Sequence, residues 1–301
     1  MPEPADDLAA LLAAGPLVLD GGLGTLLEAH GHDLRSELWS ARLLVEQPAA
    51  VRAAHAEFVA AGAQVLTTAS YQVSYAGLGA AGFTDAEVDR MLRRSVTVAR
   101  EAAGDAAVLV AASVGPYGAA RADGSEYSGA YGLSVDELRE WHRRRLRVLA
   151  EAGADLLAIE TIPSPAEVEA LCAELAEIGM PAWVSVSGAS TGFTPESRTE
   201  ALAAAAATPG VIAVGVNCCP PGDVLPALAD LDVDVALLAY PNSGERWDAV
   251  VRQWRGDGGL DDALVESWLD AGVRLVGGCC RTTPADIARV AHLVDARPAG
   301  A

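Results

Sequence analysis

Short apolar runs alternate with longer amphipathic segments along almost the whole chain. Eight of the runs have the length of a buried strand, and they cover residues 16–20, 64–68, 107–113, 155–160, 182–187, 211–217, 233–240 and 273–278. Helical patterns follow these runs. Several end in Ala-Gly-Ala or Ala-Gly-Val directly before the next strand, where glycine is the expected C-cap. The pattern therefore predicts a series of strand–helix units.

Continuous apolar strands of this kind predict a parallel sheet that is covered on both faces. Eight strand–helix units in a chain of 301 residues favour an α/β fold with one (β/α)8 TIM barrel, and a doubly wound open sheet is the alternative. No linker, charge block or low-complexity tract divides the chain. We therefore expect a single domain over residues 1–301, with a short tail from about residue 298.

The polar residues of interest gather where the predicted strands end. They are Asp20, Gly21 and Gly22, Thr67 and Thr68, Ser113, Glu160 and Thr161, Asn217 and Cys218, the segment 241–244, and residues 279–281. The longest connection, residues 114–134, follows the third strand and is rich in glycine, tyrosine and acidic residues. Loops of this length in a compact domain are usually functional. Because barrel enzymes assemble their active sites at this face, we expect the site there.

Four of the five cysteines form two doublets, Cys218-Cys219 and Cys279-Cys280, each directly after a predicted strand. Adjacent side chains of an extended strand point to opposite faces, so the chain must turn if a doublet is to bind one ion. Gly277-Gly278 precede the second doublet and permit the backbone angles that other residues avoid. We therefore predict Cys279, Cys280 and one of Cys218 or Cys219 as ligands of a zinc ion with an open fourth position. Structural burial and disulfides are the alternatives.

The chain is strongly acidic, with a net charge of −20 and a sequence pI of about 4.5. Such a surface repels nucleic acids and anionic membranes, so we expect neither as a partner. The first residues carry acids where a signal peptide needs basic residues, and Pro209-Gly210 interrupts the most apolar stretch, 201–219. With an odd number of cysteines, these features predict a cytoplasmic protein with reduced thiols. Cys172, alone in a helical pattern, is expected to pack.

Taken together, these motifs resemble those of the homocysteine S-methyltransferases, in particular the branch that uses S-methylmethionine. The resemblance extends from about residue 19 to residue 287 and includes LDGGLGTLLE, VLTTASYQ, AIETIPS, GVNC, YPNSGE and GGCCRTTP in the family's order. It implies a zinc-dependent (β/α)8 barrel that methylates homocysteine to methionine, with one Zn2+ per chain on Cys218, Cys279 and Cys280. Because the family's first ligand directly follows Gly-x-Asn, Cys219 is expected to be a bystander.

The same resemblance implies an acceptor site. Asp20 and Glu160 end the first and fourth predicted strands, where their carboxylates would converge on the ammonium group of homocysteine. For Asp20 the alternative is a helix N-cap, since Asp before Gly-Gly and a helix is a common cap. Further polar or backbone contacts are expected from Gly21, Thr68, Ser113 and Asn217.

Donor binding is expected at the long loop. Glu126, Tyr127 and Tyr131 would contact a cationic sulfonium through charge and aromatic faces, with Gln72 at the same rim. The leaving group would be a neutral thioether, so the reaction requires no general acid. No histidine–carboxylate pair lies beside the cysteines, and the five histidines, all in or beside helical patterns, are expected at the surface or in packing.

Alternatives for the reaction stay open at this point. The donor could be S-adenosylmethionine or a quaternary ammonium such as betaine, and the acceptor could be selenocysteine or selenohomocysteine. A non-catalytic zinc- or thiol-binding sensor is the alternative outside the enzymes. The sequence leaves the oligomeric state open.

Overall fold

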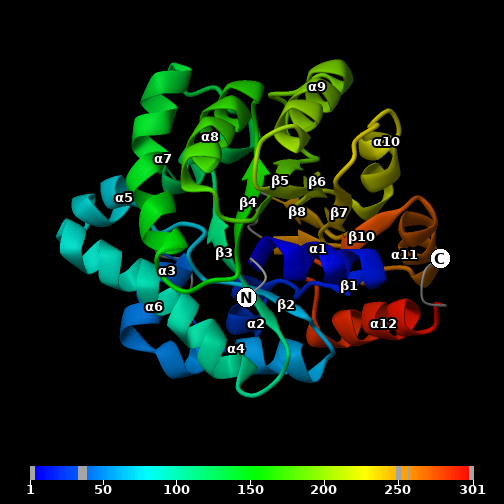
Figure 1. The fold of residues 1–301 in the computed structure, drawn as a ribbon. Helices are drawn as coiled ribbons and strands as arrows, with labels where there is room; N and C mark the ends of the chain where they lie inside the picture. Colours follow the sequence, from blue (N-terminus) through cyan, green and yellow to red (C-terminus); the bar gives the residue numbers. More distant parts are fainter. Residues whose placement is uncertain (1–3, 33–38, 122, 249–252, 257, 298–301) are drawn as a thin grey trace.

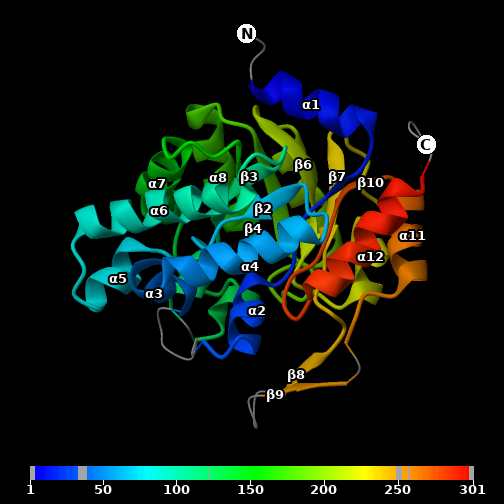
Figure 2. The same ribbon diagram turned by 90° about the horizontal axis from the view of Figure 1, so that it is seen from below.

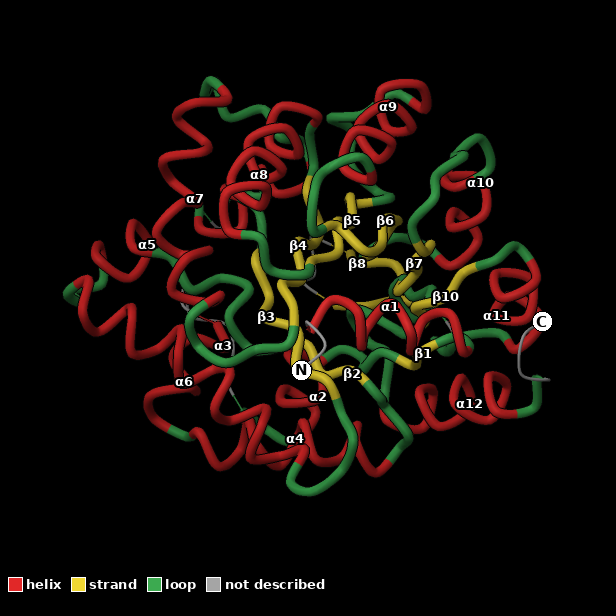
Figure 3. Tube along the Cα trace, viewed as in Figure 1, coloured by secondary structure: helices red, strands yellow, loops and turns green. Residues whose placement is uncertain are grey.

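Eight parallel strands form one sheet in the part of the chain that the computed structural model describes, which is residues 4–32, 39–121, 123–248, 253–256 and 258–297. Their order is β1-β10-β7-β6-β5-β4-β3-β2, and a parallel bridge between Leu19 and Val65 joins the two ends of the sheet. The sheet therefore closes on itself, with helices around it (Figures 1 and 3). The predicted (β/α)8 barrel is confirmed, and the open-sheet alternative is wrong. The predicted tail from residue 298 lies outside the described residues.

The barrel strands coincide closely with the apolar runs of the sequence. They are β1 Leu17–Val18, β2 Val65–Thr67, β3 Leu109–Val114, β4 Leu156–Ile162, β5 Ala182–Ser187, β6 Val211–Asn217, β7 Ala236–Tyr240 and β10 Val273–Val276. Each overlaps a predicted run, and β5 and β6 match at both ends. A short antiparallel hairpin, β8 Arg246–Asp248 and β9 Gln253–Arg255, follows β7 and was not predicted.

Helices connect the strands. They are α1 Pro4–Ala14, α2 Leu23–Ala29, α3 Trp39–Glu46, α4 Pro48–Ala60, α5 Tyr75–Ala80, α6 Asp85–Ala103, α7 Val135–Ala150, α8 Pro165–Ile178, α9 Pro195–Ala206, α10 Val224–Leu228, α11 Asp262–Asp270 and α12 Pro284–Asp295, with 3-10 turns η1 Tyr117–Ala120, η2 Ser125–Tyr127 and η3 Pro221–Asp223. None of the described helices is both long and apolar enough to cross a membrane.

Local side-chain hydrogen bonds explain where the longer helices begin. At α7 the Ser134 hydroxyl accepts from the Glu137 amide at 3.3 Å, and the Glu137 carboxylate accepts from the Ser134 amide at 2.8 Å. Thr283 and Asp286 repeat this capping box at the start of α12. Such reciprocal pairs satisfy amides that have no partner inside the helix. These hydrogen bonds fix the residues at which α7 and α12 begin.

The barrel has two apolar cores, one inside and one outside the sheet. The inner core contains side chains from the strands, such as Trp183 and Leu275, together with Leu8 and Leu12 of α1. α1 therefore covers the end of the barrel where the strands begin, and Figure 2 shows it opposite the hairpin that follows β7. The outer core fills the layer between strands and helices. The end at which the strands finish is left for a functional site.

One buried histidine makes the stability of this fold depend on pH. His55 of α4 is fully buried, and neither ring nitrogen has a hydrogen-bond partner among the described residues. Burial lowers the pKa of His55 from 6.5 to about 4. The folded state therefore favours the neutral ring, so this contribution to stability is complete above pH 6.5 and is lost as the pH falls toward 4.

Replacing His55 by leucine should remove this dependence. Between pH 7.5 and pH 5 the histidine should lower the free energy of unfolding of the parent protein by about 2 kcal/mol, and His55→Leu should not show this part of the loss. Urea denaturation at the two pH values measures the difference. His292→Leu, on the exposed side of α12, is the control. An identical pH dependence in His55→Leu and the parent protein would contradict the assignment.

Candidate active site

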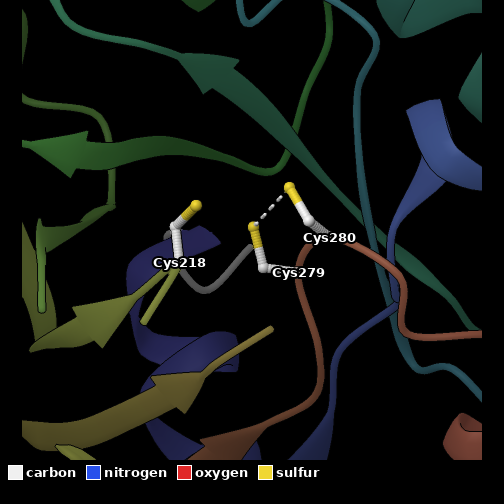
Figure 4. A group of neighbouring side chains, drawn as sticks. All are labelled: Cys218, Cys279 and Cys280. Atoms are coloured by element: carbon white, nitrogen blue, oxygen red, sulfur yellow. Dashed lines mark hydrogen bonds between the residues drawn. The ribbon is translucent and has the colours of Figure 1, made fainter. Parts of the chain in front are cut away.

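Three cysteines meet at the end of the barrel where the strands finish. Cys218 directly follows β6, and Cys279 and Cys280 lie in the loop after β10. Their Sγ atoms all lie within 4.8 Å of one another, and those of Cys279 and Cys280 are 4.0 Å apart. Figure 4 shows the three side chains gathered beyond the ends of their strands. The doublets, about 60 residues apart in sequence, are neighbours because only β7 separates β6 from β10 in the sheet.

The spacing of the three sulfurs fits a tetrahedral metal ion. A zinc–sulfur bond of about 2.3 Å places two sulfurs of one tetrahedron about 3.8 Å apart. The distances in the cluster are close to this value, so small rotations of the side chains would complete the geometry. Three protein thiolates leave the fourth position free, which is the arrangement of a catalytic zinc site.

The backbone of the first doublet separates its two cysteines. Cys218 has a φ of +49°, a left-handed conformation that costs a residue with a side chain about 1–2 kcal/mol. This turn directs Cys218 toward the cluster. Cys219 is buried elsewhere, against Gly188, where an added Cβ would lie 2.6 Å from Cys219 Cβ. Burial raises the pKa of the Cys219 thiol. Cys218 is therefore the member of the doublet that joins the cluster.

The glycines before the second doublet act through their size. We expected unusual backbone angles at Gly277 and Gly278, and that expectation is wrong, because neither has a positive φ. A Cβ on Gly277 would lie 2.8 Å from the Asp20 carbonyl oxygen, and one on Gly278 would lie 2.4 Å from Thr282 Oγ1. Gly277 lets the loops after β1 and β10 approach closely, and Gly278 lets the loop after β10 fold back on its own Thr282. The left-handed residue of this segment is Arg281, with a φ of +66°.

The loop after β7 holds the second doublet in place. Pro241 O accepts from the Cys279 amide at 2.7 Å, and Asn242 Oδ1 accepts from the Cys280 amide at 3.1 Å. Arg281 donates to both carboxylate oxygens of Glu245, at 2.8 and 3.0 Å. Fork-to-fork pairs of this kind restrict geometry as well as contribute energy. The segment 241–245 therefore fixes the doublet against β7.

The thiols of the cluster cannot all ionise without a cation. Hydrogen bonds from Cys279 and Cys280 hold the pKa of Cys218 well below its usual value. The same contacts raise the pKa values of Cys279 and Cys280 well above theirs, because the thiolate of Cys218 is adjacent. Like charges at this distance repel strongly in a buried site. Full deprotonation of the cluster therefore requires a bound positive ion.

Two buried carboxyl groups lie at the same end of the barrel. Asp20 Oδ2 accepts from the Thr67 amide at 2.8 Å, and Glu160 accepts hydrogen bonds from Ser113 and Tyr240. Burial raises the pKa of Asp20 to about 8 and that of Glu160 to about 7. A positive ligand group would restore their ionised forms. The N-cap alternative for Asp20 is wrong, because Gly22 occupies the N-cap of α2.

The other predicted acceptor residues lie at the same end of the barrel and form hydrogen bonds or close contacts within the protein. Asn217 Nδ2 donates to Thr161 Oγ1 at 2.8 Å and its Oδ1 accepts from the Thr161 amide at 2.9 Å, which supports the left-handed φ of +62° at Thr161. Thr68 Oγ1 accepts from the Ser113 amide at 3.0 Å. An added Cβ on Gly21 would lie 2.7 Å from the Thr282 carbonyl oxygen. Contacts of these residues with a substrate stay predictions.

The predicted donor residues divide into two groups. The charge of Cys218 raises the pKa of Tyr127, whose hydroxyl hydrogen-bonds to that thiol. Glu126 Oε2 and Gln72 Oε1 are buried and have no hydrogen-bond partner from the described part of the chain. Contacts of these three groups with a methyl donor stay a prediction. Tyr131 instead stacks edge-on against Tyr117, with ring centroids 5.0 Å apart.

The comparison with known proteins agrees with this arrangement. The chain matches the family described as "Homocysteine S-methyltransferase" over residues 17–294. The chain belongs to this family. It is 43% identical to homocysteine S-methyltransferase 4 of Zea mays, over 94% of this chain and 90% of that protein. It is 41% identical to selenocysteine Se-methyltransferase of Brassica oleracea var. italica, over 91% and 87%.

A solved structure of the family has the same fold. The homocysteine methyltransferase MmuM from Escherichia coli, in its metallated form, superposes with a TM-score of 0.82 at 39% identity, over 96% of this chain and 99% of that one. The sequence expectation of a homocysteine S-methyltransferase family member with a (β/α)8 barrel is therefore confirmed.

Sequence reasoning missed two tyrosines at the site of this homocysteine S-methyltransferase family member. Tyr240 ends β7 and its hydroxyl lies 2.6 Å from Ser185 Oγ while it also hydrogen-bonds to Glu160. Tyr71 hydrogen-bonds through its hydroxyl to Thr161, and burial followed by the charge of Cys218 raises its pKa. Tyr240 is the last residue of a predicted strand, and this position could have identified it as a candidate site residue.

Removing a single cluster cysteine should remove the metal. We expect Cys279→Ala and Cys218→Ala to lose the bound metal ion, because two thiolates leave the tetrahedron incomplete. Cys219→Ala is the matched control, since this neighbouring thiol lies outside the cluster. Metal analysis of the purified proteins measures the stoichiometry. A full complement of metal in Cys279→Ala would contradict the proposed ligand set.

Proposed function

We propose that this protein is a zinc-dependent methyltransferase that transfers a methyl group from a sulfonium donor to the thiol of L-homocysteine and so forms methionine. The observation that carries the proposal is the three-thiol cluster beside two buried carboxyl groups at the open end of the barrel. Zinc is the metal that three cysteine ligands with a free fourth position suit best. The metallated form of the related MmuM supports a bound metal ion.

Zinc held by Cys218, Cys279 and Cys280 would supply a positive centre that deprotonates a thiol at neutral pH. A free thiol has a pKa near 8.5, so only a few per cent is nucleophilic thiolate at pH 7. The three cysteine thiolates contribute excess negative charge to the centre. This charge keeps electron density on the substrate sulfur and favours its attack on carbon.

The carboxyl groups of Asp20 and Glu160 suit the ammonium group of homocysteine. Both are almost fully buried, and burial raises their pKa values toward neutrality. An ammonium group placed between them would stabilise the ionised carboxylates and lower these pKa values again. Hydrogen bonds from Ser113 and from the Thr67 amide already orient the two acceptors. The acceptor site is thus preorganised for an amino acid with a positive group.

The transfer itself balances without an acid catalyst. The thiol proton of homocysteine leaves to solvent, and the sulfur electron pair forms a bond to the donor methyl carbon. The bond from that carbon to the donor sulfur breaks, and its electron pair stays on the leaving sulfur as a neutral thioether. With S-methylmethionine as donor, both products are methionine. A neutral leaving group needs no protonation, which agrees with the absence of histidine from the cluster that the described residues form.

The donor side must hold a positive charge that disappears during the reaction. Tight pairing with the sulfonium would stabilise the ground state more than the transition state and would slow the transfer. Glu126 is part-buried and burial raises its pKa, so it offers a moderate counter-charge. The Tyr127 ring, 43% exposed, and the unpartnered Gln72 oxygen complete a polar and aromatic surface. We propose these three residues, with Tyr131 in support, for the donor.

A second candidate acceptor is a selenol amino acid. It is favoured by the 41% identity to a selenocysteine Se-methyltransferase, and the same cluster would bind a selenolate. The acidic surface fits small-molecule partners, with neither nucleic acid nor membrane, and we propose a cytoplasmic location. Comparing kcat/KM for homocysteine and selenocysteine decides between the acceptors.

Neutralising the acceptor carboxylates should weaken homocysteine binding. We expect Asp20→Asn and Glu160→Gln to raise the KM for homocysteine about 10- to 100-fold, since a hydrogen bond to a charged group contributes about 1.5–3 kcal/mol. Zinc content should stay normal. Asp155→Asn is the control, because this carboxylate lies before the first residue of β4 and bonds to the Val110 amide. Parental kinetics in both test variants would show that the carboxylates have another role.

A donor panel should rank sulfonium compounds first. With homocysteine as acceptor, we expect turnover with S-methylmethionine to exceed that with S-adenosylmethionine, and glycine betaine to be inactive. Glu126→Ala and Tyr127→Ala, which remove the counter-charge and the aromatic face, should raise the KM for the donor and leave the KM for homocysteine unchanged. A betaine preference, or unaltered donor kinetics in both variants, would overturn the donor assignment.

A further inference from the structure

Three ionisable side chains are buried between α7 and α8, which lie side by side outside the barrel (Figure 1). Arg145 and His142 come from α7 and Glu167 comes from α8, and each is at most 1% exposed. An Arg145 nitrogen lies 3.0 Å from His142 Nδ1, and His142 Nε2 lies 2.9 Å from Glu167 Oε1. The methyl transfer itself uses none of them. Removing charged side chains from water costs free energy, so their burial between two helices calls for an explanation.

The chemistry of arginine fixes the proton on His142. Arginine nitrogens donate hydrogen bonds and do not accept them, so His142 Nδ1 accepts from Arg145. The proton of the neutral ring is therefore on Nε2, which donates a hydrogen bond to Glu167 Oε1. Burial lowers the pKa of His142, which favours this neutral ring. The three side chains form a hydrogen-bonded relay with a single orientation.

The relay ends on three backbone groups at the mouth of the barrel, and we call these groups the donor rim. They are the carbonyl oxygens of Tyr71 and Gly115 and the amide of Tyr117. Arg145 donates to both carbonyls, with 3.5 Å to Tyr71. Glu167 Oε1 accepts from the Tyr117 amide at 2.6 Å. The relay thus joins the loop after β2 to the loop after β3.

The donor rim is continuous with the groups proposed to hold the donor. Tyr71 directly precedes Gln72 in the chain, and its hydroxyl bonds to Thr161 inside the site. The loop after β3 is packed so closely that an added Cβ on Gly118 would lie 2.3 Å from the Glu126 amide nitrogen. A shift of the donor rim would therefore displace Gln72 and Glu126 together.

We propose that Arg145, His142 and Glu167 are positioning residues for the methyl donor, which fix the donor rim from behind without contacting either substrate. This inference rests on the proposed methyl transfer. The planar guanidinium holds two carbonyls in one fixed geometry, and an ammonium group cannot reproduce it. A small displacement of the donor costs rate steeply, because transfer needs the reacting atoms aligned. Loosening the donor rim should therefore impair the donor and spare the acceptor and the metal.

The first test is Arg145→Lys, assayed with both substrates. We expect the KM for the sulfonium donor to rise about tenfold, while the KM for homocysteine and the zinc content stay at parental values. Arg144→Lys is the matched control. Arg144 lies over the Tyr75 ring, 4.5 Å from its centroid, as Arg145 lies over the Trp141 ring at 4.7 Å, but Arg144 pairs with Asp89 on α6. It should leave both KM values unchanged.

A second matched pair removes carboxylates. Glu167 and Glu174 are both buried on α8 and both bond to α7, but Glu174 pairs with Arg139 and Arg143 and not with the donor rim. Glu167→Ala should reproduce the donor defect, and Glu174→Ala should not. If both variants raise the two KM values together, in step with a loss of thermal stability, the role is structural support alone and the proposal fails.

Hydrogen exchange separates this inference from the proposed function. Amide exchange in residues 115–131 should accelerate in Arg145→Lys and not in Arg144→Lys, whether or not a donor is present. Equal exchange in the two variants would overturn the positioning role. A parent enzyme that is inactive with every donor would overturn the proposed methyl transfer, and the exchange measurement would still decide whether the relay fixes the donor rim.

Discussion

The rest of the site depends on one electrostatic constraint, the gathering of Cys218, Cys279 and Cys280 within 4.8 Å. At this largely buried end of the barrel the thiols can share one negative charge, but three thiolates repel one another unless a cation lies between them. Binding of a metal ion would therefore contribute free energy to the folded state. The left-handed backbone at Cys218 and Arg281 is strain that this contribution offsets.

The same constraint explains why polar groups are so concentrated at this end of the barrel. Asp20 and Glu160 are buried beside the cysteines, and burial raises their pKa values. Burial therefore disfavours the ionised forms of both carboxyl groups when no ligand is bound. Binding of a substrate ammonium group would ionise them and complete the charge balance. Under the proposed function, this arrangement would suit a negative nucleophile and positive substrate groups, at some expense in stability.

Much of the fold was predictable, because the barrel strands are buried on both faces. Continuous apolar runs such as 182–187 and 211–217 identify strands without reference to the rest of the chain. The hairpin after β7 escaped prediction because its strands have only three residues each. α1 was not predicted because its role is to cover the end of the barrel where the strands begin, which is a tertiary property.

The candidate site was predictable in its residue types and less so in its geometry. Strand ends and the two doublets indicated the cluster, but choosing Cys218 over Cys219 requires the backbone angle at Cys218 or the family resemblance. Gly277 was misjudged because close approach to another loop leaves no local signal in the sequence. His142 was expected at the surface or in packing, and it is buried, but its hydrogen bond to Glu167 of α8 could not be inferred from its own helix.

X-ray absorption spectroscopy of the zinc-loaded protein tests the central claim most directly, because it counts sulfur ligands around the ion. The account predicts three sulfurs at about 2.3 Å and one lighter atom in the resting protein. Addition of L-homocysteine should change this to four sulfurs at the same distance. A sulfur count that stays at three when homocysteine saturates the protein would contradict the account, since the substrate thiol would then be activated elsewhere.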